Sequence, residues 1–178
     1  MRIGIDVSQL AYENAGVSNY LESLVTNLIA NENNKYVLFY SSLRRGVPRT
    51  ILEMLKKPNV ILKKAKLPPT ALHILWNILH TAPIEIFIGD VDIFISSDWT
   101  EPPAKKALKA TILYDLIVYK YPKETAKKIV KVQRKKLSWV KKESDIVFCI
   151  SESTKKDAQD ILGIKPEKLK VIYPGLTI

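Results

Sequence analysis

The sequence predicts an α/β fold built on a doubly wound, mainly parallel, Rossmann-like sheet. Short apolar runs rich in β-forming residues mostly lack polar alternation, which is typical of strands buried on both faces. Several are separated by helical patterns, and strand alternating with helix favours a parallel sheet. The runs are Arg2–Asp6, Tyr36–Tyr40, Val60–Leu62, Asp92–Ile95, Ala110–Tyr114, Asp145–Ile150 and Leu169–Tyr173.

Three segments between these runs have helical character. From Val17 to Ile29, apolar residues recur at three- and four-residue spacing and form one continuous stripe. The segment Pro68–Phe87 is apolar around most of a helix and is interrupted at Pro83, which predicts one or two buried helices. Thr125–Lys142 places apolar residues at roughly helical spacing among many lysines.

Composition indicates one compact domain, because 178 residues with 47% hydrophobic content can bury a core. No apolar run reaches the roughly 18 residues that span a bilayer. The single cysteine, Cys149, excludes an intramolecular disulfide and a cysteine metal cluster, and favours a cytoplasmic setting. His73 and His80 have no third ligand at a metal-like spacing, so packing histidines and no metal site are expected.

The net charge of +10 is concentrated in one segment, since Lys120–Lys142 holds ten of the 28 basic residues and one of the 18 acidic ones. This pattern predicts either a solvated helix face or a surface for anionic lipid or a phosphate-linked acceptor. No nucleic-acid recognition motif accompanies it, so nucleic acid is not an expected partner. The candidate residues are Lys127, Lys128, Lys131, Arg134, Lys135 and Lys136.

Ligands of open α/β sheets bind beyond the carboxyl ends of the strands, and the segments after four of these strands are polar. Gly16, Val17 and Ser18 open a helix after the first strand, where glycine lets a phosphate approach backbone amides, although a turn with a capping Ser18 or Asn14 explains them equally. After the fourth strand, Asp98 and Glu101 supply carboxylates and Trp99 supplies an aromatic ring, a combination suited to a sugar. An ordinary surface loop explains these residues as well.

Tyr114 and Asp115 follow the next strand, and Ser151 follows the sixth. A carboxylate directly after a central strand can orient a substrate hydroxyl, but it can equally cap the next helix. Ser151 is also well placed to cap a helix, and capping uses the same exposed amides that bind phosphate.

In order along the chain, these pieces resemble family 4 (group 1) retaining glycosyltransferases, and specifically the N-terminal half of their GT-B fold. The resemblance rests on Arg2–Asp6, Gly16–Tyr20 and Asp90–Phe94. It continues through Tyr114–Leu116 with Pro122, Ser151–Asp157 and Glu167–Gly175.

The resemblance implies transfer of a sugar from a nucleotide-sugar donor to an acceptor, with retention and without an obligatory metal. Gly16, Val17 and Ser18 would face the donor phosphates, while Asp98, Trp99, Glu101 and Ser151 would bind the acceptor. Tyr114 and Asp115 would be catalytic, with Tyr114 standing where the family usually has histidine.

The implied organisation is an acceptor-binding domain over 1–173, with 174–178 beginning a linker to an absent C-terminal donor-binding domain. We therefore expect no cofactor bound by this domain alone, a sugar or lipid-linked acceptor, and no turnover by the isolated chain. A cytoplasmic protein, peripheral on the inner membrane face, is expected. The alternative is a non-catalytic module that docks on anionic membrane or a partner protein through the basic helix.

Overall fold

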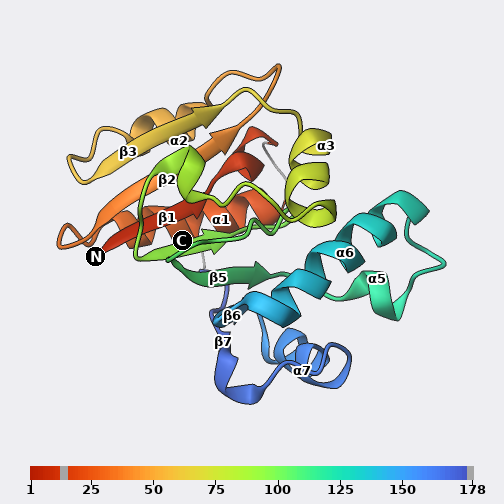
Figure 1. The fold of residues 1–178 in the computed structure, drawn as a ribbon. Helices are drawn as coiled ribbons and strands as arrows, with labels where there is room; N and C mark the ends of the chain where they lie inside the picture. The colour runs from red at the N-terminus through yellow and green to blue at the C-terminus, as the bar shows by residue number, and fades with distance from the viewer. Residues whose placement is uncertain (13–15, 176–178) are drawn as a thin grey trace.

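In the computed structural model, which describes residues 1–12 and 16–175, a seven-stranded, all-parallel sheet runs through the molecule (Figure 1). The strand order is β3-β2-β1-β4-β5-β6-β7. All seven expected strands are present. Their bounds are β1 Arg2–Asp6, β2 Lys35–Ser41, β3 Val60–Ala65, β4 Ile93–Ser96, β5 Leu108–Leu113, β6 Ile146–Cys149 and β7 Leu169–Val171.

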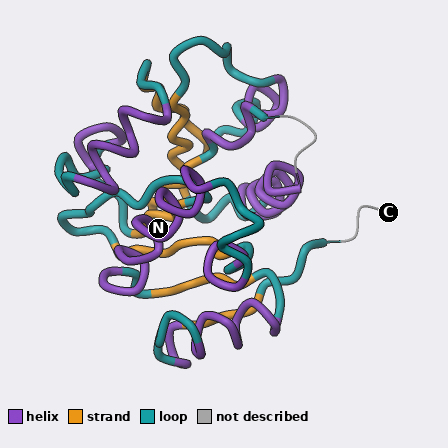
Figure 2. The backbone as a smooth tube through the Cα atoms, turned by 90° about the vertical axis from the view of Figure 1, so that its right-hand side faces the viewer, coloured by secondary structure: helices purple, strands orange, loops and turns teal. Residues whose placement is uncertain are grey.

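Helices flank the sheet on both sides (Figure 2), as expected for a doubly wound fold. The helices are η1 Ser8–Ala11, α1 Gly16–Ile29, α2 Arg49–Met54, α3 Pro69–Leu72, η2 His73–Ile78, α4 Glu85–Ile88, α5 Ile117–Lys120, α6 Lys127–Glu143, α7 Glu152–Asp160 and η3 Pro166–Lys168. The expected helix from 125 to 142 is therefore α6, which begins two residues later.

Strand order places a topological switch point between β1 and β4. From β1 the chain adds β2 and β3 on one side, then crosses to the other side to add β4 through β7. Loops that follow β1 and β4 diverge at that point, and such divergence opens a crevice at the carboxyl edge of the sheet. Two of the polar segments singled out in the sequence follow β1 and β4, and the other two follow β5 and β6.

Gly4 shows how tightly the sheet and helices pack. A Cβ atom on Gly4 would lie 2.7 Å from the Ile88 side chain and 2.9 Å from that of Phe94. Its neighbour Ile5 points to the opposite face and joins the core formed with α1. Glycine in β1 therefore lets α4 approach the sheet closely.

The segment Pro68–Phe87 is helical as predicted, but it is not buried all round. Trp76, Ile84 and Ile88 are fully buried. In contrast, Ile74, Leu79 and Ile86 are 50%, 63% and 64% exposed. Residues 73–78 form a π-helix, whose wider turn changes which side chains face the sheet.

Cys149 lies in the core as predicted, and burial raises the pKa of its thiol to about 11. It is therefore a packing residue rather than a reactive thiol. Across residues 1–12 and 16–175, no helix combines the length and the apolar character needed to cross a membrane.

Candidate functional site

A cavity of about 270 Å³ lies beyond the carboxyl end of β5, between the loop after β4 and helix α6. It brings together four of the segments chosen from the sequence. Tyr114 and Asp115 meet Asp98, Trp99 and Val17 there. The remaining lining residues are Ile112, Leu113, Ile117, Val118, Thr125, Ile129, Gln133, Lys136 and Leu137.

Tyr114 directly follows β5 and is largely buried, with 9% of its surface exposed. Its ring meets the Tyr20 ring edge to face, with centroids 5.6 Å apart, and its hydroxyl lies 3.4 Å from Ser97 Oγ. Burial raises the pKa of Tyr114, so the phenol stays protonated at neutral pH. Tyr114 can therefore donate a hydrogen bond to a ligand but cannot act as a base there.

Asp115 is exposed and caps the following turn. Its Oδ1 accepts a hydrogen bond from the backbone N–H of Ile117 at 3.0 Å. The same side chain lines the cavity, so capping and ligand binding are compatible.

Asp98 is held by a helix on the opposite side of the cavity. Gln133 Nε2 donates to the Asp98 carboxylate at 3.2 Å and to its carbonyl oxygen at 3.1 Å. Burial raises the pKa of Asp98, while the nearby ammonium of Lys136 and the Gln133 bond lower it. Trp99 lies beside it, and its carbonyl accepts a hydrogen bond from Asn77 Nδ2 at 2.9 Å.

Glu101 does not reach the cavity, which corrects its expected contact with an acceptor. Its side chain is 0% exposed and lies beneath the cavity, 3.3 Å from the ammonium of Lys109. Ser96 Oγ donates to its other oxygen at 2.5 Å. The loop turns inward after Trp99 because these buried partners satisfy the carboxylate.

Ser151 also lies outside the cavity lining and acts as a helix cap. Its side chain is at the N-cap of α7 and accepts a hydrogen bond from the backbone N–H of Thr154 at 3.1 Å. Ser151 therefore acts as the N-cap of α7, and it is not among the residues that line the cavity.

At the start of α1, only Val17 reaches the cavity. A Cβ atom on Gly16 would meet nothing within 4 Å, so packing does not demand glycine there. Ser18 is 4% exposed and points into the protein. Asn14, the other candidate cap, lies outside the described residues.

Five of the six candidate basic residues are exposed on α6, and Lys136 is not. Lys136 is 2% exposed because it shares the inward face of the helix with Leu137 and Val140. Its expected place on an anionic-binding surface is therefore wrong. The exposed residues are Lys127, Lys128, Lys131, Arg134 and Lys135.

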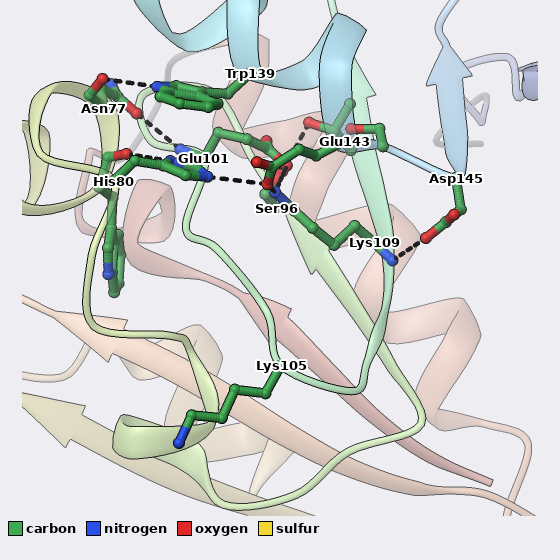
Figure 3. Close-up of polar contacts among 12 residues, drawn as sticks. Asn77, His80, Ser96, Glu101, Lys105, Lys109, Trp139, Glu143 and Asp145 are labelled. Atoms are coloured by element: carbon green, nitrogen blue, oxygen red, sulfur yellow. Dashed lines mark hydrogen bonds and ion pairs between the residues drawn. The ribbon is translucent and has the colours of Figure 1, made fainter.

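A network of partly buried charged and polar side chains that sequence reasoning missed ties η2, and the segment after it, to α6 and β5 (Figure 3). Glu143 Oε2 lies 2.9 Å from His80 Nε2 and 3.0 Å from Lys109 Nζ. Trp139 Nε1 donates to the Asn77 carbonyl at 2.8 Å. These partners are far apart in the sequence, so no local pattern could have identified the network.

The packing role expected for His80 is confirmed, because its ring stacks on that of Trp139. Within the described part of the chain, no group of three or more His, Cys, Asp or Glu side chains could hold a metal ion. The residues that line the cavity include groups that accept and donate hydrogen bonds, among them Asp98, Tyr114 and Gln133.

Comparison with known proteins adds to this geometry. A search of curated proteins returned no match. The family model described as Glycosyltransferase Family 4 matches residues 14–178, which includes every segment that lines the cavity. The all-parallel, Rossmann-like sheet is consistent with the N-terminal domain of a GT-B enzyme. The chain therefore belongs to Glycosyltransferase Family 4, as a GT-B N-terminal domain.

Proposed function

We propose that this domain is the acceptor side of an enzyme that transfers a sugar from a nucleotide-sugar donor to an acceptor, with retention of configuration. The observation that carries the proposal is the cavity at the carboxyl edge of the sheet. It combines the carboxylate of Asp98 with the phenol of Tyr114 and the indole of Trp99. Carboxylates accept from sugar hydroxyls, and aromatic side chains contact the apolar faces of sugar rings.

In this proposal the residues have distinct roles. Tyr114, kept protonated by burial, donates to an oxygen of the reacting sugars. Asp115 has one carboxylate oxygen bound to the Ile117 amide, and its other oxygen orients the acceptor hydroxyl. The N-terminal end of α1, from Gly16 to Ser18, faces the donor phosphates, since helix N-termini favour negative charge.

We further propose that donor binding and turnover require a C-terminal donor-binding domain. The proposed transfer needs no obligatory metal. In this proposal the isolated chain is inactive and binds no cofactor by itself. The sugar transferred is a hexose in this proposal, and the acceptor is a sugar or a lipid-linked sugar.

A membrane surface is the second proposed partner. The exposed lysines of α6 form one positively charged helix face. The neighbouring η2, joined to α6 through Trp139 and Asn77, exposes Ile74 and Ile78. Basic and apolar side chains together favour peripheral binding to anionic lipid on the cytoplasmic face.

A transfer assay tests the proposed function. The chain is joined to a GT-B C-terminal donor-binding domain and supplied with nucleotide-sugars and saccharide acceptors. Product with the donor's anomeric configuration, measured by proton NMR, is expected from the joined protein and not from the chain alone. Product of inverted configuration, or turnover by residues 1–178 alone, contradicts the proposal.

A further inference from the structure

Lys136 is 2% exposed and lines the cavity together with Asp98 and Tyr114. Its Nζ donates to Thr111 Oγ1 at 3.1 Å. Among residues 1–12 and 16–175, no carboxylate forms an ion pair with it. An ammonium has three N–H donors, so the described contacts leave two for a molecule in the cavity.

A chain of buried side chains fixes the hydroxyl that holds Lys136. Ser96 Oγ lies 2.5 Å from Glu101 Oε2 and 2.7 Å from Thr111 Oγ1. A carboxylate only accepts, so Ser96 Oγ donates to Glu101. Thr111 must accept from Lys136, which only donates. Lys109 Nζ lies 3.3 Å from Glu101, so this series of contacts ends in an ion pair between buried side chains.

The charges around Lys136 determine which ligands suit the cavity. Burial lowers the pKa of Lys136, while the carboxylates of Glu101, Asp98 and Asp6 raise it. Asp98 and Asp115 line the cavity itself, against this one buried ammonium. An anionic ligand group would face both carboxylates, whereas a neutral hydroxyl can accept from Lys136 and donate to Asp98.

We propose that Lys136 and Asp98 together select an uncharged sugar ring, rather than an anionic one, as the unit that fills the cavity. Lys136 donates to a hydroxyl of that ring, and the carboxylates of Asp98 and Asp115 disfavour an anionic ligand group. The inference deepens the proposed function, because it names the acceptor class of the same site. The cavity of about 270 Å³ is close to the lower end of the roughly 300–1,000 Å³ range of small-molecule sites. That size suits a single ring, and any phosphate on the acceptor lies outside the cavity.

Binding of simple sugars to residues 1–178 tests this inference without any transfer reaction. The probes are the methyl α-glycosides of glucose, galactose and mannose, with the methyl glycoside of glucuronic acid as the anionic match. Saturation-transfer NMR at tens of millimolar measures their binding. We expect at least one neutral glycoside to bind, and the glucuronoside to bind at least about tenfold more weakly than methyl glucoside.

Lys136→Met should weaken binding of the neutral glycoside at least about tenfold, because a charge-assisted hydrogen bond is lost. Lys135→Met, an exposed neighbour on the same helix, is the matched control and should leave binding unchanged. The amide spectrum shows whether each variant is folded. If Lys136→Met does not fold, Asp98→Asn provides the test, because it should raise glucuronoside affinity relative to methyl glucoside at least about threefold.

Three results would overturn the inference: no neutral glycoside binds, the glucuronoside binds as tightly as methyl glucoside, or folded Lys136→Met binds like the wild type. None of them bears on sugar transfer by the joined protein. Conversely, failure of the transfer assay leaves the charge preference of the cavity measurable. The two proposals are therefore separable.

Discussion

The imidazole of His80 lies flat against the indole of Trp139, with ring centroids 3.5 Å apart and planes 7° from parallel. This stack joins the segment after η2 to α6, and Asn77 in η2 and Glu143 in α6 complete the junction by hydrogen bonds. His80 adopts a positive φ of 50°, which is uncommon for a residue other than glycine. The junction holds a strained backbone in place next to the loop that bears Trp99.

Trp139→Ala should lower the free energy of unfolding by about 2–4 kcal/mol, because it removes the stack on His80 and the hydrogen bond to Asn77. Urea unfolding followed by circular dichroism measures the change. Tyr173→Ala is the control, since Tyr173 is 63% exposed and should change stability by less than about 0.5 kcal/mol. Equal effects of the two substitutions would contradict a structural role for the stack.

Glu143 should make stability depend on acid pH. Burial raises its pKa, but the bonds from His80 and Lys109 outweigh burial and hold the pKa below the ordinary value. Because the folded pKa is depressed, the stabilisation is present above the unfolded pKa of about 4.3 and is lost as pH falls through the folded pKa.

Glu143→Gln should therefore be destabilising at pH values near neutrality, with a difference from wild type that shrinks as pH falls below about 4. Thermal unfolding of both proteins across this range measures it. A difference that stays constant down to the acid end would show that the charge of Glu143 contributes nothing.

The exposed lysines of α6 should supply most of the affinity for anionic vesicles, if the membrane proposal holds. Reversing Lys127, Lys128, Lys131 and Lys135 to Glu should abolish pelleting with phosphatidylserine-containing vesicles at low salt. A control variant makes the same charge change on other exposed lysines. It reverses Lys56, Lys63, Lys64 and Lys66. If the two variants pellet alike, the charge run is only a solvated face.

Tyr114→Phe and Asp115→Asn should each reduce turnover of the joined enzyme while changing stability by less than about 1 kcal/mol. The phenol loses only a hydroxyl that lies 3.4 Å from Ser97 Oγ, so the packing of its ring on Tyr20 remains. Kinetics and thermal unfolding of the same preparations separate the two effects. Full activity in both variants would show that Tyr114 is only a core residue and that Asp115 only caps a helix.

Gly4→Ala and Gly16→Ala should have opposite effects. At Gly4 the added Cβ would lie 2.7 Å from Ile88, so we expect a loss of about 1–3 kcal/mol of stability. At Gly16 the Cβ meets nothing within 4 Å, so stability should be unchanged or slightly higher. Reduced use of the nucleotide-sugar by the joined Gly16→Ala enzyme would support close donor approach there, and an unchanged KM for the donor would oppose it.

The local pattern of side chains was enough to predict the strands, the main helices and the placement of Tyr114 and Asp115. Runs such as those at 36–40 and 145–150 are apolar on both faces, and such runs fit only a covered sheet. In a parallel sheet, every residue that follows a strand lies at the same edge. The convergence of Asp98, Trp99 and Tyr114 on one cavity therefore follows from topology.

Only the tertiary structure decided how Glu101 and Lys136 are used. The sequence pattern predicts that both side chains are exposed, because a charged residue in a loop or on a basic helix is normally solvated. Each is instead buried beside a partner distant in the chain, Lys109 for Glu101 and Thr111 for Lys136. Burial of a charge depends on which distant groups compensate it, and a local sequence pattern carries no information about such partners.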